Sequence, residues 1–367
     1  MAEGLRSSSP SWQHVRALAE KLLQRGWWSH SLRTVLSYRA RSPDDASLRF
    51  LNEAFSQAPL KIWLVMDQGI GNMVMLTPTI RAIKELYPAA SLEVIGREES
   101  LAVIRGWELV NRCSTCEAVD FSDPPDVLLL SIWSNDFLKA HRDDLTSLPG
   151  VILQARTINP NRHEAEHHLD LARALGYRRP LPSPYCHREE VVWPFEENRP
   201  VVLLADTSHP SPVWRRKRWP RYRELAQRLL ELGYQVGLIG GAVEAREFDP
   251  RNWPPGVTSL LGRYSIPQMA YLISRADLFI GNDSGPAHIA GAVGTRTIVI
   301  FGPTREKKNR PLGPRVSLLR ADIPCRPCQY TSRWNSCERT LCMSSIRVDD
   351  VLRTMERLME GDRCHAL

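Results

Sequence analysis

The sequence lacks several features that define whole classes of protein. It has no uninterrupted run of about 18 apolar residues, so no helix is expected to span a membrane. The first residues, MAEGLR, have neither the apolar centre nor the cleavage site of a signal peptide, which favours a cytoplasmic protein. There is no internal repeat of roughly 20–50 residues and no interleaving of aromatic and basic residues, so neither a solenoid nor a nucleic-acid partner is expected.

The composition is that of an ordinary globular chain. With 43% hydrophobic and 24% charged residues, a disordered or fibrous protein is excluded. The 367 residues are enough for two domains of roughly 100–200 residues each. The net charge of +7 suits a phosphorylated small molecule, and it would also support peripheral contact with the anionic inner face of a membrane.

Residues 1–58 are predicted to form a helical appendage. Three short helices are expected, at 12–24, 31–38 and 44–55. Trp27 and Trp28 need a surface to pack on, which favours a helical cap on the main body over a contact with a membrane or a partner.

From residue 59 to 185 the sequence alternates between apolar strands and helices. A strand at 62–66, a glycine-rich turn, a helix at 73–86 and a strand at 91–95 form a βαβ unit, which implies a parallel sheet. Further elements are expected as strands at 127–132 and 151–154 and a helix at 163–175.

A proline-rich linker at 186–200 precedes a second alternating series at 201–345. Its strands are expected at 201–205, 236–239, 278–280 and 297–301, and its helices at 221–232, 266–274 and 286–292. Residues 346–367 are predicted to form a closing amphipathic helix that ends at Gly361. The fold class is therefore α/β, with two parallel-sheet domains.

Two glycine-containing loops are candidate ligand sites. Gly69 and Gly71 follow the first predicted strand, where glycines let backbone amides approach a ligand, although the same glycines and an N-cap Asn72 also serve an ordinary tight turn. The segment Gly281–His288 is more specific, because it places small and polar residues at the carboxyl edge of a parallel sheet, where ligands bind. Its candidate residues are Asn282, Asp283, Ser284, Gly285 and His288.

The basic segment Arg215–Pro220 lies between the first strand and first helix of the second series. Lys217 and Arg218 suit a diphosphate, since Lys supplies a point charge and Arg a fork of donors. The plain alternative is a solvated surface loop.

Four cysteines are grouped near the end of the second series. Cys325, Cys328, Cys337 and Cys342 have the spacing C-x2-C-x8-C-x4-C in a polar segment without a predicted strand. Four thiolates at this density predict one structural zinc or iron site, against the alternative of unpaired loop cysteines. Cys113 and Cys116 form a second C-x2-C pair without further nearby ligands, and a buried pair is expected there.

Three of these motifs together resemble the heptosyltransferase family of bacterial glycosyltransferases. They are Gly69–Pro78, Lys217–Pro220 and Gly281–His288, in the right order, and Phe301–Thr304 and the cysteine group are also similar to features of many members. The resemblance covers about residues 60–355.

The resemblance implies a GT-B fold, in which two Rossmann-like domains face each other across a cleft. It also implies inverting transfer of a sugar, most often heptose from ADP-heptose, to a cell-surface glycan precursor or a protein. Lys217, Arg218 and the loop residues Asp283, Ser284, Gly285 and His288 match donor-binding positions. No metal ion is expected to be needed for the transfer itself.

One position departs from the family pattern. Lipopolysaccharide heptosyltransferases typically carry an aspartate, assigned as the base, where this chain has Asn72, and an amide cannot take a proton at neutral pH. Either another carboxylate such as Asp67 serves as base, or Asn72 only positions the acceptor, or the chain is inactive. The remaining alternatives are a non-catalytic sugar-nucleotide-binding protein and a sugar-nucleotide epimerase on a similar fold.

Overall fold

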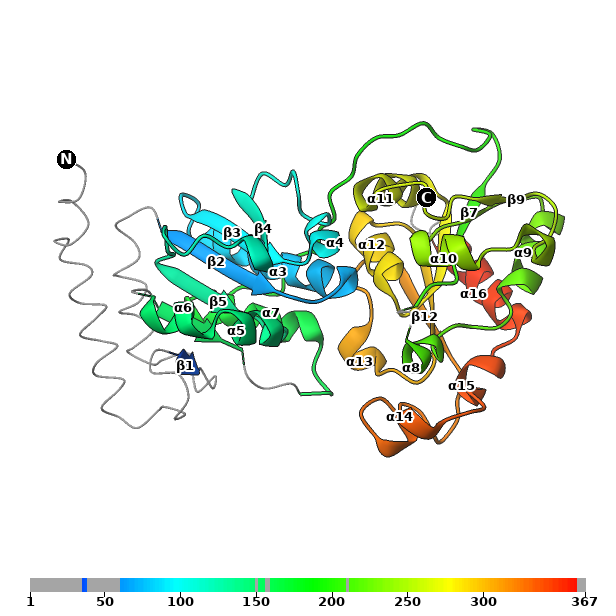
Figure 1. Ribbon diagram of the computed structural model, residues 1–367. Helices are drawn as coiled ribbons and strands as arrows, with labels where there is room; N and C mark the ends of the chain where they lie inside the picture. The colour runs from blue at the N-terminus through cyan, green and yellow to red at the C-terminus, as the bar shows by residue number, and fades with distance from the viewer. Residues whose placement is uncertain (1–34, 38–59, 149–150, 156–158, 209–210, 362–367) are drawn as a thin grey trace. The chain divides into compact units, whose positions relative to one another are not determined.

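The computed structural model describes residues 35–37, 60–148, 151–155, 159–208 and 211–361, which form two compact units (Figure 1). The first unit holds the chain up to Asn159 together with Glu164–Pro182, and the second holds Pro160–His163 and the chain from Ser183 onward. The expected helices at 12–24 and 44–55 lie outside the described residues.

The first unit is built on a six-stranded, fully parallel sheet of order β1-β6-β5-β2-β3-β4. Its strands are β1 (Val35–Ser37), β2 (Lys61–Met66), β3 (Ser91–Gly96), β4 (Arg112–Thr115), β5 (Val127–Leu130) and β6 (Val151–Gln154). Its helices are α3 (Ile70–Leu86), α4 (Glu98–Leu101), α5 (Asn135–Ala140), α6 (Arg142–Ser147) and α7 (Glu164–Ala174), with a 3-10 turn at Cys116–Ala118.

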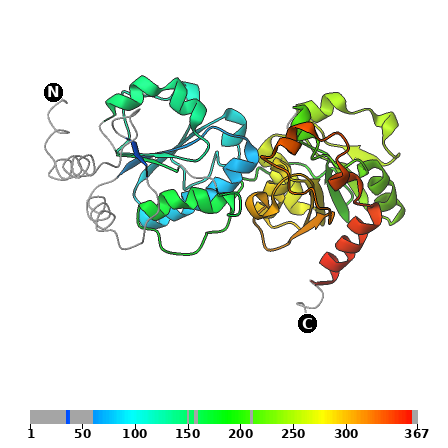
Figure 2. The same cartoon turned by 90° about the horizontal axis from the view of Figure 1, so that it is seen from below.

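Helices cover both faces of this sheet. Figure 2 shows α5 and α6 on one face and α3 and α7 on the other. Phe137 of α5 and Leu145 of α6 pack against Trp63, Val65 and Leu128 of the central strands, while α3 and α7 pack on each other. Double coverage explains why β2 from Ile62 onward and the whole of β5 are apolar and do not alternate.

The sequence-based prediction is wrong at two points in this unit. The predicted helix at 31–38 contains β1, because Val35–Ser37 pair in parallel with β6 and this pairing overrides local propensity. β4 was not predicted, because the short edge segment RCST is mostly polar and gives little strand signal.

The second unit repeats the architecture with the order β12-β11-β10-β7-β8-β9. Its strands are β7 (Val201–Ala205), β8 (Gln235–Leu238), β9 (Val257–Ser259), β10 (Leu278–Asn282), β11 (Thr297–Phe301) and β12 (Val316–Arg320). Its helices are α8 (Pro212–Arg215), α9 (Tyr222–Glu231), α10 (Ala242–Glu247), α11 (Ile266–Arg275), α12 (Gly285–Val293), α13 (Glu306–Asn309), α14 (Ser332–Ser336), α15 (Leu341–Ser344) and α16 (Val348–Gly361).

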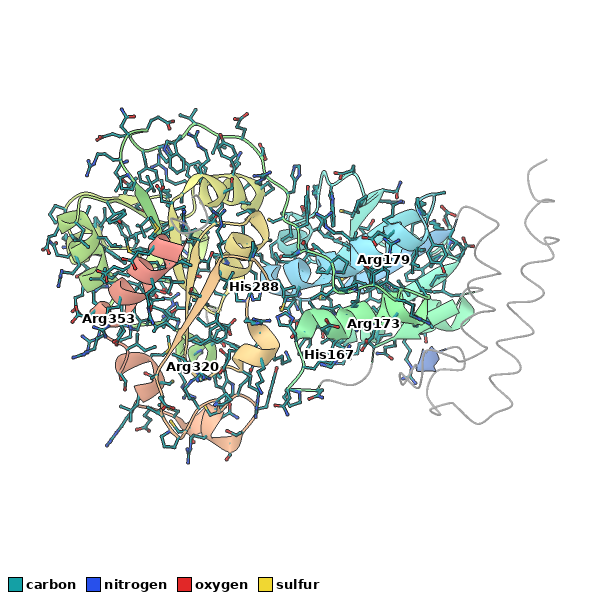
Figure 3. The ribbon with its side chains drawn as sticks, turned by 180° about the vertical axis from the view of Figure 1, so that it is seen from behind. His167, Arg173, Arg179, His288, Arg320 and Arg353 are labelled. Carbon is teal, nitrogen blue, oxygen red and sulfur yellow. The ribbon has the colours of Figure 1, made fainter. Side chains whose placement is uncertain are left out.

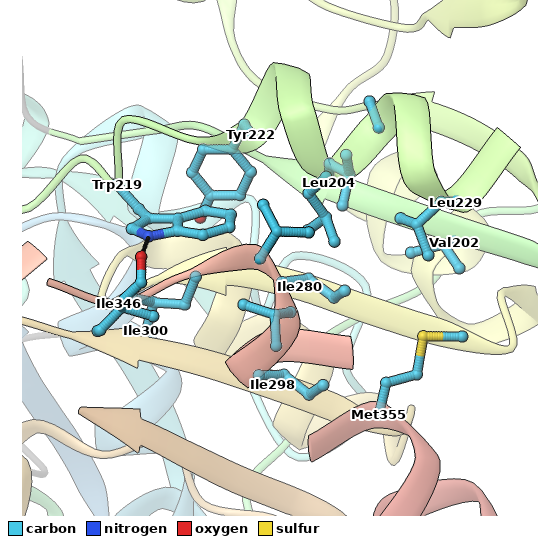
Figure 4. Packing of buried hydrophobic residues seen from close by; sticks show 14 of the residues in the cluster. Val202, Leu204, Trp219, Tyr222, Leu229, Ile280, Ile298, Ile300, Ile346 and Met355 are labelled. Atoms are coloured by element: carbon cyan, nitrogen blue, oxygen red, sulfur yellow. Dashed lines mark hydrogen bonds between the residues drawn. The ribbon is translucent and has the colours of Figure 1, made fainter. Parts of the chain in front are cut away.

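The core of the second unit joins its central strands to α9 and α16 (Figure 4). Val202, Ile280 and Ile298 of the strands meet Leu229 of α9 and Met355 of α16. The predicted closing helix is therefore part of the second unit's core. At one end of the cluster Trp219 Nε1 donates a hydrogen bond to the Ile346 carbonyl at 2.9 Å.

The predicted linker at 186–200 has no helix or strand, and it packs on the second unit. The Glu189 amide donates to the Pro267 carbonyl at 3.1 Å, and a Cβ on Gly237 would lie 2.6 Å from Phe195 Cζ. None of the described helices is long and apolar enough to cross a membrane.

Gly302 allows α15 to approach the end of β11, and this generates a stability prediction. A Cβ at Gly302 would overlap Met343 Sδ and lie 2.9 Å from Met343 Cγ and 3.3 Å from Cys342 Sγ. Because both side chains are buried, Gly302→Ala is expected to cost about 1–3 kcal/mol and lower the Tm by roughly 2–10 °C in thermal denaturation.

Gly69→Ala is the matched control. A Cβ there meets nothing within 4 Å and the φ angle of −73° suits alanine. Equal Tm values for the two variants would contradict the packing of α15 on Gly302.

Candidate functional site

The strand order reverses beside β2 in the first sheet and beside β7 in the second. β2 pairs with β3 on one side and β5 on the other, and β7 likewise pairs with β8 and β10. The loops after such neighbouring strands diverge, and ligands of open α/β sheets bind in the crevice at this edge. The residues predicted from sequence lie at these edges in each unit.

In the second unit, the loops after β7 and β10 meet. Thr207 Oγ1 and Ser284 Oγ form a hydrogen bond of 2.8 Å. Lys217 Nζ donates to the Asp283 carbonyl and lies 3.5 Å from Asp283 Oδ2, and both side chains are largely buried. The structure thus brings together Lys217, Asp283 and Ser284, as predicted from their positions after strands.

The N-terminus of α12 faces the same edge. Ser284 is the N-cap residue, and its hydroxyl makes no capping bond. The first turn holds no acidic residue, so the positive end of the helix dipole is not offset there. His288, labelled in Figure 3, is 4% exposed, and its Nε2 lies 3.9 Å from Asp283 Oδ1. This arrangement of backbone amides and a lysine suits a phosphate group.

Asn282 is placed differently from the expectation. Its side chain is fully buried; its Oδ1 accepts from the Trp219 amide and the Tyr222 hydroxyl, each at 3.1 Å, and its Nδ2 donates to the Thr207 carbonyl at 3.3 Å. These bonds leave no surface for a ligand, so Asn282 holds the loop in place.

The two predicted phosphate-binding cations, Lys217 and Arg218, point in different directions. Arg218 turns away from Lys217 towards α10, where it contacts Glu247 Oε2 at 2.8 Å and Glu244 Oε1 at 3.5 Å. The same contact is the first cause of the lowered pKa of Glu247. Two carboxylates already offset the Arg218 charge, so Lys217 is the better placed of the two for a diphosphate.

Asp206 is a residue of this edge that the sequence analysis missed. It follows β7 directly, and that position was the available signal. It lines a cavity with Arg218, Arg223 and Trp253, and its Oδ1 is buried without a hydrogen-bond partner among the described residues. Burial raises the pKa of Asp206 to about 6, against the opposing effect of the two arginines.

In the first unit, Asn72 lies in the first turn of α3, and the helix is capped by Gly69 and not by Asn72. Gly71 follows Gly69 in the same turn. Asn72 Nδ2 donates to Glu164 Oε1, and Trp133 Nε1 donates to the same oxygen at 2.7 Å. Glu164 was not predicted, because nothing in the helical segment 163–175 distinguishes it from an ordinary helix-start acid.

Asp67, the predicted alternative base, is buried and hydrogen-bonded to the backbone of α5. It is 2% exposed, and its Oδ2 accepts from the backbone amides of Asp136 and Phe137 at 2.9 and 3.0 Å, at the start of α5. Burial raises the pKa of Asp67, and these amide bonds act in the opposite direction. The geometry assigns Asp67 to anchoring α5 beside β2.

The four grouped cysteines line one cavity next to Arg216 and Arg326. Burial, followed by the charges of Cys328, Cys325 and Cys337, raises the pKa of Cys342 to about 11. No group of three or more His, Cys, Asp or Glu side chains among the described residues has the geometry of a metal site. Cys113 and Cys116 are half-buried, and burial raises the pKa of each to about 11.

Asp206 generates a pH prediction. A carboxyl group with a folded pKa near 6 and an unfolded pKa near 4 stabilises the fold when protonated, and this stabilisation is lost as pH rises through 6. As pH rises from about 4.5 to 7.5, wild type should therefore lose about 2 kcal/mol of unfolding free energy relative to Asp206→Asn, measured by urea denaturation at each pH.

The control is Asp249→Asn. Hydrogen bonds from Arg251 lower the pKa of the exposed Asp249, so its trend with pH should have the opposite sign. An Asp206→Asn stability difference that does not change with pH would refute the buried state of Asp206.

Comparison with known proteins shows which family the sequence matches. The profile of glycosyltransferase family 9 (heptosyltransferase) matches residues 160–337. Lipooligosaccharide heptosyltransferase 2 of Campylobacter jejuni subsp. jejuni serotype O:6 is 30% identical over 323 residues, which cover 82% of this chain and 99% of the relative.

Solved structures share the fold. A family 9 glycosyl transferase of Veillonella parvula has a TM-score of 0.68 at 16% identity, covering 84% of this chain and 99% of its own. E. coli heptosyltransferase WaaC, solved with ADP, has a TM-score of 0.60 at 15% identity. The match covers 82% of this chain and 100% of WaaC. The heptosyltransferase TibC, described as iron-containing and solved with ADP-D-β-D-heptose, has a TM-score of 0.57 at 14% identity. The match covers 83% of this chain and 76% of TibC.

The predicted GT-B fold, with two parallel-sheet domains, is confirmed by these structures. The predicted family is confirmed by a relative that the chain covers over nearly its whole length. The chain belongs to glycosyltransferase family 9, the heptosyltransferase family.

Proposed function

We propose that this chain transfers a heptose from ADP-heptose, with inversion, to a cell-surface glycan precursor or a protein acceptor. The observation that carries the proposal is the convergence of Lys217, Ser284 and the start of α12 at the edge of β7 and β10. The similarity to structures solved with ADP and with ADP-D-β-D-heptose supports the choice of donor.

The second unit would hold the leaving group of the reaction. An attacking acceptor oxygen displaces the diphosphate from the anomeric carbon, and negative charge develops on the diphosphate. Lys217 has three N–H donors, so its contact with Asp283 leaves donors for a phosphate oxygen. The positive end of α12 adds to this stabilisation, so the transfer needs no metal ion.

Two alternative functions make different predictions for product release. A binding protein releases no ADP, and an epimerase alters the sugar without an acceptor. A transferase releases ADP at a rate that depends on the acceptor. ADP release from ADP-heptose, measured with and without a bacterial glycolipid extract, separates the three. The +7 charge supports work at the cytoplasmic face of a membrane, where such acceptors are found.

We also propose that Cys325, Cys328, Cys337 and Cys342 hold one structural metal ion, zinc or iron. The four thiols line one cavity, and the arginines beside it would offset the charge of four thiolates. The similarity to an iron-containing heptosyltransferase supports this proposal. Four sulfur ligands leave no open position, so the ion would order the segment and take no part in the transfer.

Lys217→Ala tests donor binding. The loss of one charge-assisted contact should weaken ADP binding roughly ten- to hundredfold in isothermal titration calorimetry. Arg353→Ala, an exposed cation on α16, is the control and should leave affinity unchanged. Unchanged ADP affinity in the Lys217 variant would reject the assignment.

Elemental analysis tests the metal proposal. Protein purified without added metal should contain about one equivalent of zinc plus iron, and Cys325→Ser/Cys328→Ser should contain less than roughly 0.2 equivalents. Cys113→Ser/Cys116→Ser is the matched control and should keep the wild-type content. Metal-free wild-type protein, or full occupancy in the first double variant, would rule the site out.

A further inference from the structure

Glu164 is a buried carboxylate that has no role in the function proposed above. It begins α7, its side chain is 1% exposed, and it faces the first turn of α3, on which α7 packs. Its Oε1 accepts two hydrogen bonds from neutral donors, Asn72 Nδ2 and Trp133 Nε1. Asn72 and Trp133 are half-buried, so the hydrogen-bonded group extends from the core to the surface of the unit.

The position of this group matches that of a ligand site. Asn72 follows β2 and Trp133 follows β5, the two neighbouring strands at which the order of the first sheet reverses. Loops at this reversal form the binding crevice of open α/β sheets. Through these two residues, Glu164 contacts both segments that follow the strands at this reversal.

A second proton-binding side chain lies behind the carboxylate. His168, one turn further along α7, is fully buried, and its Nε2 is 3.7 Å from Glu164 Oε1. Neither of its ring nitrogens makes a hydrogen bond within the described part of the chain.

The other polar residues of the first glycine loop are not suited to take a proton. Asn72 has no basic group at neutral pH, and the Asp67 carboxylate is held by the amides of α5. Glu164 is the carboxylate that Asn72 contacts directly. A hydroxyl group entering the crevice would take the place of the Asn72 amide as donor to Oε1.

We propose that Glu164 is the base of the transfer reaction, that Trp133 orients it, and that the acceptor hydroxyl takes the donor position held by Asn72. This inference rests on the proposed function. The acceptor oxygen forms a bond to the anomeric carbon as the bond from that carbon to the diphosphate oxygen breaks. The electron pair of the broken bond leaves with the diphosphate, and the hydroxyl proton passes to the Glu164 carboxylate.

The hydrogen bond between Asn72 and Glu164 allows a test by exchange. Glu164→Gln replaces the carboxylate by an amide of the same shape, and turnover of ADP-heptose with a bacterial glycolipid extract should fall by roughly 10²–10⁴. Asn72→Asp/Glu164→Gln exchanges the two groups, so that the carboxylate is at position 72 and the amide at position 164. Its turnover should be at least about ten times that of Glu164→Gln.

Two measurements keep this test separate from folding and from the proposed function. ADP binding occurs on the second unit, so every variant should keep wild-type ADP affinity in calorimetry. Glu166→Gln, on the same helix and paired with Arg173 at 2.6 Å, is the matched control and should keep wild-type turnover. If wild-type protein releases no ADP in the presence of the extract, the proposed function fails and Glu164 is not at issue.

With an active wild type, the outcomes decide the inference. Glu164→Gln with more than about half of wild-type turnover overturns it, as does a loss that the exchange variant does not recover. If Glu164→Gln does not fold, Glu164→Asp decides, because it keeps the carboxylate but draws it back by one methylene. A loss of turnover of at least about tenfold with intact ADP binding then supports the inference, and wild-type turnover overturns it.

Discussion

The side chain of Asn282 fixes the site of the second unit through three hydrogen bonds. It joins the end of β10 to the start of α9, through Trp219 and Tyr222, and to the loop after β7, through Thr207. These segments are 60 or more residues from Asn282 in sequence. Because the amide is buried, its loss would leave several polar groups unpaired in the core. Lys217 precedes Trp219 by two residues, so its position relative to Asp283 depends on this junction.

The two units use the same edge of the sheet for different chemistry. In the second unit, a lysine and a helix N-terminus provide positive charge, while Asp283 contacts Lys217 and Glu247 binds Arg218. In the first unit, neutral donors and a buried carboxylate predominate. Under the proposed function, the second edge would suit the charged donor and the first edge a neutral hydroxyl acceptor.

The sequence predicts most of the fold, because the central strands and long helices carry strong patterns. β2, β5, β7, β10 and β11 are apolar runs that end in glycine or polar residues, and they lie where expected. The edge strands β1, β4, β9 and β12 escaped prediction, since they are short or half-exposed and are defined by pairing with a neighbour.

The site is predictable to the level of its loops but not of its contacts. The motif positions place Lys217, Asp283 and Ser284 at one edge, as observed. The sequence could not show that Arg218 turns towards Glu247, since these residues are 29 positions apart and meet only through α10. It could not connect Asn72 to Glu164 either, because that contact spans 92 positions and depends on how α3 and α7 pack.

The segment that holds the cysteines touches the lysine loop through two tryptophans. The rings of Trp214 and Trp334 meet edge to face with centroids 5.1 Å apart, and Lys217 Nζ lies 4.9 Å from the centre of the Trp214 ring. Arg216 reinforces the contact by donating to the carbonyls of Trp334 and Asn335. Coupled indole rings give a near-ultraviolet circular dichroism signal that depends on their mutual angle, and a neighbouring ammonium perturbs indole emission. A change at the junction of the lysine loop and the cysteine segment would therefore alter the contribution of this pair to the signal of the eleven tryptophans.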